Sequence, residues 1–256
     1  METETIKLMF LGTRGEIEAR SPRHRRHSSL LIQDGDTRIM IDCGRDWLGR
    51  VNSIAPTAIV LTHAHPDHAA GLAKGAPCAV YATKETLDLI GRYPIDGREV
   101  PLQRAMPISG LKFKAFPIEH SLRAPAVGYR ISARALSLFY LPDVANLPNA
   151  TRALRGVALY IGDGATTKRS MVRKRNGILI GHAPVTVQLG WCASAGVRRA
   201  IFTHCGSSIV RGDARKLNAL IRHLGHECNI DARLACDGDR LALTRDGQHW
   251  QIQWMP

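Results

Sequence analysis

Short apolar runs separated by turn residues recur along the chain, and most of them have the length and composition of β-strands. The run "AIVLT" is apolar at nearly every position, which indicates a buried strand. The turn sequence "QDGD" joins two other runs and is typical of a β-hairpin. We expect strands over residues 6–12, 28–32, 37–42, 58–62, 79–83, 111–118, 126–132, 136–141, 157–162, 199–203, 240–244 and 249–254.

Helical segments lie singly between these runs. Pro66 falls in the first turn of a helix within "PDHAAGLAK", and Gly71 and Gly75 limit its length. Further helices are expected over residues 83–91, 184–195 and 211–224. Because strands dominate both halves of the chain, we expect an α/β sandwich of two mixed sheets with helices outside, forming one domain over residues 1–256.

Composition narrows the class of protein. With 256 residues, 45% of them hydrophobic, the chain can bury a full core. It has no run of 18 apolar residues, and the start "METETIKLMF" lacks the features of a signal peptide, so we expect a cytoplasmic protein without membrane contact. The six cysteines form no C-x-x-C pair, which favours reduced thiols.

The chain is strongly basic, with a net charge of +13 and an isoelectric point near 10.0, so its field attracts anions. Two basic runs stand out, "RSPRHRRH" at 20–27 and "TTKRSMVRKR" at 166–175. Each is equally compatible with a solvated loop that aids solubility. We select Arg23, Arg25 and Arg26 as candidate substrate contacts. Aromatic residues do not interleave with the basic ones, so a nucleic-acid partner is conceivable but not favoured.

The segment "LTHAHPDHAAGL" crowds His63, His65, Asp67 and His68 into six residues directly after a predicted strand. In an extended loop His63 and His65 lie on the same side, while Asp67 and His68 on the first helical turn can face back toward them. Imidazole and carboxylate suit zinc, manganese or iron. The segment supplies about half of the ligands that two such ions need, so the others must come from later strand ends.

Three later residues, His120, Asp143 and His204, each follow a predicted strand, so all three can converge on one sheet edge. Asp42, which follows "TRIMI", is expected to orient the histidine loop, although a plain turn aspartate fits equally. Histidines without such placement are expected on the surface: His24, His27, His223, His226 and His249.

These motifs resemble the metallo-β-lactamase fold, and within it the phosphodiesterase branch that includes ribonuclease Z and the phosphoribosyl cyclic phosphodiesterases. The histidine motif is shared with lactonases and thioester hydrolases of the same fold, whereas "LGTRG" and the "GH" segment point to phosphodiesterases. The resemblance implies an αββα sandwich. The segments that carry it are "LGTRG", "SSLLI", "MIDCG", "HAHPDH", "EHS", "YLPDV", "GDGAT", "GHAPVTVQLGWCASAGV" and "IFTHCG".

The resemblance also implies two divalent metal ions, zinc or manganese, and a set of roles. Asp143 would bridge the ions, with Asp163 as the rival bridge, and His182, oriented by Asp163, would protonate the leaving group. His182 could instead be a plain helix-start residue before Pro184. The implied ligands are His63, His65 and His120 for one ion and Asp67, His68 and His204 for the other, and the implied catalytic residues are Asp67, His182 and Asp163.

The expected activity is hydrolysis of a small or cyclic phosphodiester, nucleotide-derived compounds included, by a hydroxide that two metal ions activate. A lactonase or thioesterase of the same fold is the alternative. A tRNA-processing endonuclease is less favoured, because only 22 residues separate His120 from Asp143 and leave no room for the long arm of ribonuclease Z. The cysteine cluster that holds a structural zinc in some cyclic phosphodiesterases is also missing. The sequence leaves open whether the protein forms a homodimer.

Overall fold

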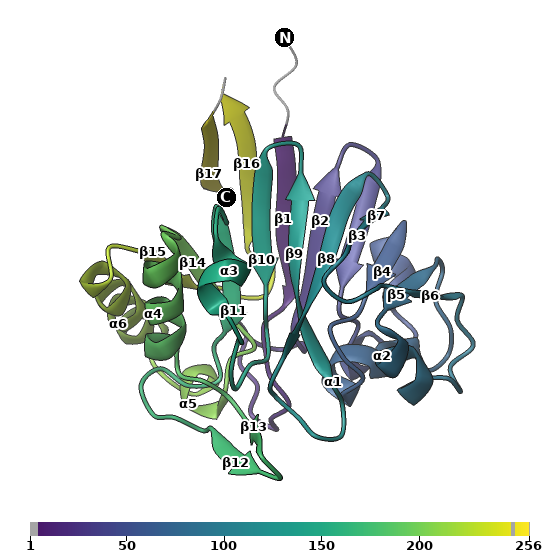
Figure 1. The fold of residues 1–256 in the computed structure, drawn as a ribbon, viewed down its shortest axis with the longest axis horizontal. Coiled ribbons are helices and arrows are strands. Elements are labelled where there is room, and N and C mark those ends of the chain that lie inside the picture. Colours follow the sequence, from purple (N-terminus) through teal and green to yellow (C-terminus); the bar gives the residue numbers. More distant parts are fainter. Residues whose placement is uncertain (1–4, 247–248, 256) are drawn as a thin grey trace.

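Two mixed β-sheets pack face to face in the computed structural model, which describes residues 5–246 and 249–255 (Figure 1). In the described residues the first sheet has the order β17-β16-β1-β2-β3-β4-β5-β6 and the second β15-β14-β11-β10-β9-β8-β7. The strands of the first sheet are β1 (Thr5–Gly12), β2 (Ser29–Asp34), β3 (Thr37–Ile41), β4 (Ala58–Val60), β5 (Val80–Ala82), β6 (Gly97–Glu99), β16 (Arg240–Asp246) and β17 (His249–Met255). Those of the second are β7 (Ala105–Ile108), β8 (Leu111–Ile118), β9 (Ala126–Ala133), β10 (Leu136–Tyr140), β11 (Leu159–Asp163), β14 (Arg199–Thr203) and β15 (Asp231–Leu234).

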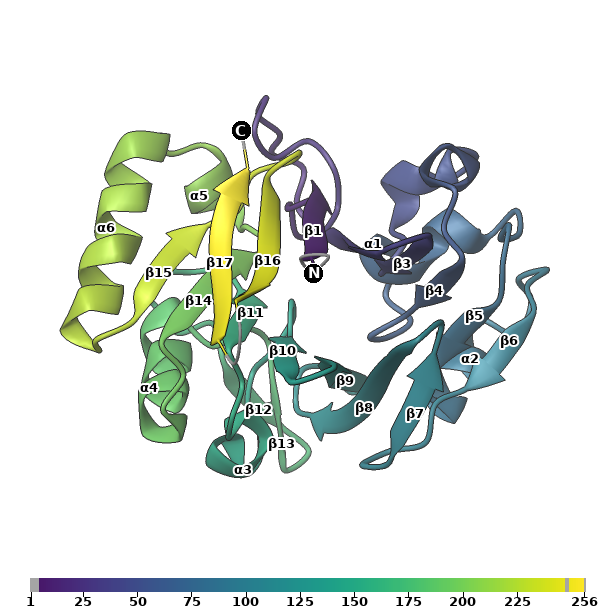
Figure 2. The same cartoon turned by 90° about the horizontal axis from the view of Figure 1, so that it is seen from above.

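Helices cover the outer faces of both sheets, with α4 and α6 on the second sheet and α1 and α2 beside the first (Figure 2). Among the described residues no helix has the length and apolar character that crossing a membrane requires. The α-helices are α1 (Pro66–Ala69), α2 (Lys84–Leu89), α3 (Ala150–Leu154), α4 (Val185–Ala195), α5 (Ser207–Val210) and α6 (Ala214–Glu227). Short 3-10 helices span Arg45–Trp47, Val51–Ile54 and Ala70–Leu72, and a small hairpin pairs β12 (Arg173–Arg175) with β13 (Ile178–Ile180).

The alternation of side chains along the strands explains the layers. In β1, Ile6, Leu8 and Phe10 point into the core between the sheets, where they join Phe113 and Tyr129 of the second sheet. The other faces are also apolar and pack beneath the helices, so the described residues form three hydrophobic clusters and four layers. The predicted sandwich of two mixed sheets is therefore confirmed.

Strand direction places the loops of interest together. Strands β3 and β4 run parallel, as do β10, β11 and β14, so the carboxyl ends within each of these groups lie at one edge of its sheet. The loops after these ends meet at the bottom of Figure 1, near α1 and α5. This edge is where ligand sites form in sheets of this kind.

Every predicted strand overlaps an observed one, but several elements were not predicted. Strands β6 and β12 read "GRE" and "RKR" and are fully exposed, so they carry no apolar alternation. Helix α6 begins at Ala214, later than predicted, because the Asp213 side chain accepts hydrogen bonds from the next turn. The helix that begins at Pro66 gives way to a 3-10 turn at Ala70, where Gly71 packs against Cys43.

Gly44 determines how closely α1 approaches the loop after β3. A Cβ at Gly44 would lie 2.0 Å from the carbonyl oxygen of Asp67. We expect Gly44→Ala to lower the free energy of unfolding by about 1–3 kcal/mol through this overpacking. Gly190→Ala in α4 is the control, because no atom lies within 4 Å of its added Cβ and alanine favours a helix by about 0.5–1 kcal/mol. Urea unfolding of both variants measures the difference, and equal stability would contradict the steric argument.

Candidate metal centre

The histidine loop begins where β4 ends and turns into α1 at Pro66. His63 is completely buried, and its Nε2 lies 3.0 Å from Nδ1 of His65. Asp67 and His68 lie on the single turn of α1 and are also buried. The first helical turn thus faces back toward the loop, as the spacing predicts.

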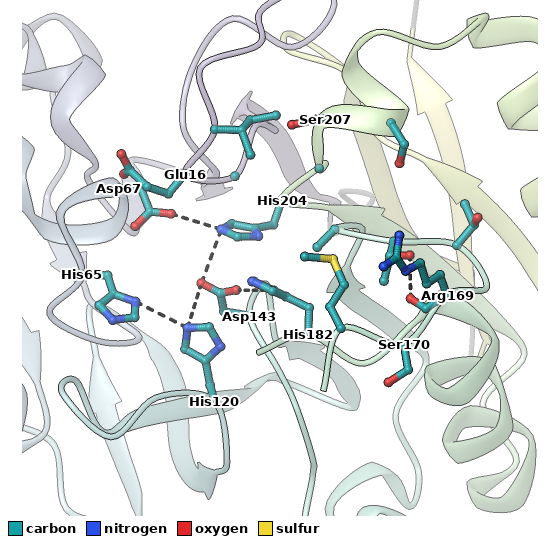
Figure 3. Close-up of a pocket in the computed structure, with 18 of the residues that line it drawn as sticks. Glu16, His65, Asp67, His120, Asp143, Arg169, Ser170, His182, His204 and Ser207 are labelled. Atoms are coloured by element: carbon teal, nitrogen blue, oxygen red, sulfur yellow. Dashed lines mark hydrogen bonds and ion pairs between the residues drawn. The ribbon is translucent and has the colours of Figure 1, made fainter. Parts of the chain in front are cut away.

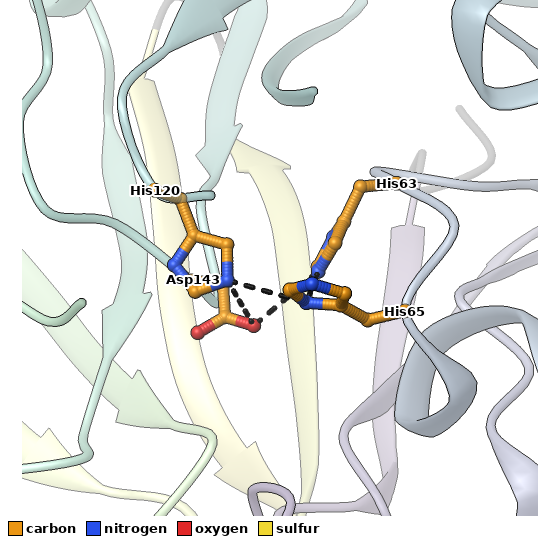
Figure 4. A group of neighbouring side chains, drawn as sticks. All are labelled: His63, His65, His120 and Asp143. Carbon is orange, nitrogen blue, oxygen red and sulfur yellow. Dashed lines mark hydrogen bonds and ion pairs between the residues drawn. The ribbon is translucent and has the colours of Figure 1, made fainter. Parts of the chain in front are cut away.

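One group of ligand atoms comes from His63, His65, His120 and Asp143, and these atoms all lie within 4.8 Å of one another (Figure 4). Nε2 of His63 and Nε2 of His120 each lie 3.5 Å from Oδ2 of Asp143. His120 follows β8 and Asp143 follows β10, so the second sheet supplies half of this group.

A second group consists of Asp67, His68, His204 and the same Asp143. Nε2 of His68 lies 3.1 Å from Oδ2 of Asp143, and Nε2 of His204 lies 3.3 Å from the same oxygen. Oδ2 of Asp67 lies 3.2 Å from His68 Nε2 and 3.1 Å from His204 Nε2. Oδ2 of Asp143 therefore contacts histidines of both groups and lies between them.

Asp163 lies beside the two groups but is occupied by other partners. Its Oδ2 accepts hydrogen bonds from the Val144 amide at 3.0 Å and from Nδ1 of His182 at 2.8 Å. Its Oδ1 accepts from the Ala165 amide at 2.8 Å. Nδ1 of His182 also lies 3.0 Å from Oδ1 of Asp143. Asp163 thus holds the ring of His182 against the centre. The two residues also form a third group of possible ligand atoms, together with Asp143 and His204.

Outer partners orient the histidine rings. Asp42 is fully buried and accepts from the Thr62 amide at 2.8 Å and from Nδ1 of His68 at 2.9 Å. The carbonyl oxygen of Gly181 accepts from Nδ1 of His120 at 3.1 Å. Such contacts leave the opposite ring nitrogen facing the centre, which is the arrangement that metal-bound histidines need. Asp42 and His204 both adopt positive φ angles, 62° and 54°, which non-glycine residues retain mainly at functional sites.

The electrostatics of the groups follow from burial and charge. Burial lowers the pKa of His63 well below its usual value, and burial together with His120 lowers the pKa of His65 to about 4, so both rings are neutral. Burial opposes charge on Asp143, but the surrounding histidines outweigh it and hold its pKa well below the usual range. Burial likewise opposes charge on His182, but Asp163 and then Asp143 outweigh it and raise its pKa to about 11.

The donor set fits divalent cations. Nε2 of His68 and Oδ1 of Asp143 are buried and form no well-aligned hydrogen bond with any described residue, although each lies 3.0–3.2 Å from an ionisable partner. Buried polar atoms without hydrogen bonds are rare in proteins, and a metal ion is one explanation for them. Neutral imidazoles, as at His63 and His65, and ionised carboxylates, as at Asp143, are the forms that bind metals. Burial opposes charge on His68 and His204, but neighbouring aspartates raise the pKa of both, so a metal ion in the second group would displace a proton from each ring.

A cavity of about 1010 Å³ opens over the centre. Its lining includes His65, Asp67 and His120 together with three basic residues, Lys168, Arg169 and Arg173, which we call the basic wall. Figure 3 shows Arg169 and Ser170 on the opposite side of the cavity from His65 and Asp67, with Asp143, His182 and His204 between them. An anionic ligand in this cavity therefore contacts the candidate metal groups on one side and basic residues on the other.

Comparison with known proteins decides the family. A sequence model of the beta-lactamase superfamily domain matches residues 37–205, a range that includes all seven candidate ligands. The chain belongs to the beta-lactamase superfamily.

Relatives of this superfamily member include ribonuclease Z of Methanopyrus kandleri, 31% identical over 149 residues, which are 51% of this chain and 51% of that protein. The chain thus spans about half the length of that relative. Ribonuclease Z of Mycobacterium marinum is 26% identical over 84% of this chain and 91% of its own. A crystal structure of a new diphosphatase from the PhnP family has a TM-score of 0.73 at 21% identity, with 94% of this chain and 98% of that chain covered. The resemblance to metallo-β-lactamase fold enzymes of the phosphodiesterase branch is therefore confirmed.

The basic loop at 20–27 contributes no residue to the lining of the cavity over the centre. Arg23, Arg25 and Arg26 are absent from the residues that line the cavity over this superfamily centre. The Asp237 side chain accepts from the amides of Arg25 and Arg26, and the Arg26 guanidinium lies over the Trp47 ring. The second basic run, at 166–175, lines the cavity instead.

Two histidines expected on the surface are buried. Nδ1 of His24 lies 2.7 Å from the Thr13 hydroxyl, and Nε2 of His27 lies 2.9 Å from the guanidinium of the buried Arg14. His223 and His226 are exposed as expected, whereas the side chain of His249 lies outside the described residues.

Several contributors to the site were not predicted. The Thr62 hydroxyl lies 3.0 Å from Nδ1 of His63, and the Ser121 hydroxyl lies 3.2 Å from Nε2 of His65. Thr62 directly precedes the candidate ligand His63, and Ser121 directly follows the candidate ligand His120. This adjacency is the one signal in the sequence that could have identified them. Glu16 lines the cavity from a loop and Ser207 from the first position of α5, and no sequence pattern marks either residue.

Proposed function

We propose that this chain hydrolyses small phosphodiesters with two divalent metal ions, zinc or manganese. His63, His65 and His120 would hold one ion, Asp67, His68 and His204 the other, and Asp143 both. The observation that carries the proposal is that Oδ2 of Asp143 lies within 3.5 Å of ring nitrogens from both groups. The basic wall of the same cavity supports an anionic substrate.

When bound, two such ions supply a hydroxide nucleophile near neutral pH and offset the charge of the phosphoryl oxygens. Asp67 lines the cavity and can accept a hydrogen bond from the attacking water through its carboxylate. His182 lines the same cavity, with 22% of its side chain exposed. Because Asp163 holds Nδ1 of His182, Nε2 is the atom that can protonate the leaving oxygen.

A small substrate fits the chain better than a tRNA. The β9–β10 hairpin, residues 126–140, makes up most of the segment between His120 and Asp143. This segment therefore carries no long arm of the kind that grips tRNA in ribonuclease Z. Because the relatives are ribonuclease Z proteins, nucleic acid is the competing substrate class. Turnover of a tRNA precursor at a higher kcat/KM than any small diester would favour the nuclease.

A substrate comparison tests the reaction class. Enzyme reconstituted with zinc or manganese is assayed with bis(p-nitrophenyl) phosphate, a simple lactone and a thioester. We expect turnover of the phosphodiester and little of the acyl substrates, since the basic wall of the cavity favours an anionic phosphoryl group. The opposite order would replace the phosphodiesterase with an acyl hydrolase of the same fold.

Metal content is a separate prediction. Five histidines and two aspartates exceed what one tetrahedral ion uses, so we expect about two equivalents of metal per chain. Elemental analysis of protein purified without chelator, and again after reconstitution, measures the ratio. A value of one or less after reconstitution would contradict the pair of ions.

A further inference from the structure

We infer that the carboxylate of Glu16 accepts hydrogen bonds from hydroxyl groups of the substrate, and so selects phosphodiesters that carry a sugar with free hydroxyls. Glu16 lines the cavity over the candidate centre, and Figure 3 shows it on the side of Asp67, away from Arg169. The inference rests on the proposed phosphodiesterase function and narrows its substrate class to sugar-bearing diesters.

Glu16 stands at the tip of a tight turn. The Ile17 amide donates to the carbonyl oxygen of Gly15 at 2.8 Å, which closes a three-residue γ-turn around Glu16. Arg14 precedes the turn, and its side chain is only 2% exposed. The Arg14 guanidinium donates to the carbonyl oxygens of both Gly15 and Ile17. One buried cation therefore holds the backbone on either side of Glu16.

Further contacts fix Arg14 itself. Its guanidinium lies 2.7 Å from Oδ2 of Asp46 and donates to the Arg25 carbonyl oxygen at 3.2 Å. The same Asp46 oxygen accepts from the His27 amide at 2.9 Å. Breaking one side of such a buried ion pair is costly. The turn thus keeps its position without a ligand, and a group that it binds finds Glu16 already in place.

The turn also packs against the candidate metal centre. The Gly15 amide donates to the Cys205 carbonyl oxygen at 3.1 Å, and the Cys205 amide donates to the Thr13 carbonyl oxygen at 2.6 Å. A Cβ at Gly15 would lie 2.9 Å from Cε1 of His204, so glycine permits this close approach to the ring. Glu16 is therefore the next residue after one that touches a candidate ligand, and a group bound by Glu16 would lie beside the phosphoryl group being cleaved.

The charge of Glu16 is not neutralised by the protein. Its side chain is 52% exposed, and among residues 5–246 and 249–255 its one ion-pair contact is with Nε2 of His27 at 3.8 Å. The Arg14 guanidinium donates to this same nitrogen at 2.9 Å, and a guanidinium can only donate, so the nitrogen has no proton to offer Glu16. The carboxylate oxygens of Glu16 are thus available to a ligand.

The surroundings indicate which donor the ligand supplies. An ionised carboxylate only accepts hydrogen bonds, so it repels phosphate and binds hydroxyl or amine donors. An ammonium group is disfavoured, because Lys168, Arg169 and Arg173 line the same cavity and the chain has a net charge of +13. Neutral hydroxyls are favoured, and a carboxylate that accepts from ribose hydroxyls recurs in nucleotide sites. Ile17, which also lines the cavity, offers an apolar contact to the C–H face of a sugar.

The test compares the p-nitrophenyl esters of uridine 5′-phosphate and 2′,3′-dideoxyuridine 5′-phosphate, which differ only in two hydroxyls. We expect the metal-reconstituted wild-type enzyme to favour the ribose ester about tenfold to a hundredfold in kcat/KM, as hydrogen bonds to a charged acceptor do. Glu16→Ala should abolish this preference by slowing the ribose ester alone. Glu16→Gln keeps one acceptor oxygen and should retain part of the preference.

Glu18→Ala is the matched control. Glu18 is exposed like Glu16 and lies two residues further along the same loop, but it does not line the cavity. Its replacement removes the same charge from the loop and should leave the preference for the ribose ester unchanged.

The outcomes separate the role of Glu16 from the reaction. Equal turnover of both esters by the wild-type enzyme, or an equal loss of preference in Glu18→Ala, overturns the hydroxyl contact while the phosphodiesterase stands. Faster turnover of both esters by the same factor in Glu16→Ala also overturns it, because Glu16 would then only repel the substrate.

If neither ester is cleaved, the phosphodiesterase fails and binding tests the contact by itself. Calorimetry then compares uridine 5′-monophosphate with its 2′,3′-dideoxy analogue. Tighter binding of the ribose compound that Glu16→Ala removes supports the contact, and equal affinities overturn it.

Discussion

Replacing Asp143 by alanine is expected to remove metal and activity together. Its Oδ2 lies 3.1 to 3.5 Å from the Nε2 atoms of His63, His68, His120 and His204. Without this oxygen each group keeps only three donors and no ligand joins them. Changes to the outer partners of metal ligands typically cost about tenfold to a hundredfold in affinity or activity, so loss of the shared ligand should exceed that. Metal content and turnover of a phosphodiester are measured on the same preparation.

Asp163→Asn is the matched comparison for Asp143. The oxygens of Asp163 are engaged by the Val144 and Ala165 amides and by Nδ1 of His182. An asparagine keeps the shape of the side chain but removes its charge, so this variant should retain its metals and lose mainly rate. If Asp163→Asn loses metal and Asp143→Ala keeps it, the roles of the two aspartates are exchanged.

His182→Ala is expected to discriminate between leaving groups. A general acid typically contributes about a hundredfold to ten-thousandfold when the departing oxygen needs a proton. Turnover of a diester with an alkoxide leaving group should fall by that amount. Turnover of a p-nitrophenyl diester should fall much less, because p-nitrophenolate departs without a proton.

Metal analysis accompanies the His182 experiment, because Nδ1 of His182 lies 3.0 Å from Oδ1 of Asp143. The variant should contain as much metal as the wild-type protein. Equal losses on both substrates, or loss of metal, would leave His182 as a binding or structural residue.

The candidate ligands could be located from the sequence because parallel strands end at a common edge. His63, Asp143 and His204 each follow a short apolar run, and a polar residue after such a run is easy to recognise. Asp42 could be placed for the same reason, since it follows β3 and contacts the neighbouring Thr62 and His68. An apolar run followed by a polar residue was enough to place a candidate ligand wherever the end of one strand determined the position of that residue.

The basic loops could not be placed in the same way. The course of the 20–27 loop depends on Asp237, more than two hundred residues further along the chain, which accepts from the amides of Arg25 and Arg26. The β12–β13 hairpin depends on Glu119, which accepts from the Leu179 amide. Sequence patterns describe local periodicity, and neither contact is local.

The origin of the ligands has a consequence for folding. His63, His65, Asp67 and His68 follow the first sheet, whereas His120, Asp143 and His204 follow the second, so neither sheet alone carries a complete donor group. A tightly binding ion therefore selects the state in which the two sheets have already docked, and it stabilises that state by mass action. If the proposed ions bind, we expect metal uptake to follow docking of the two sheets, and chelation to loosen the sandwich along the edge that carries the donor groups.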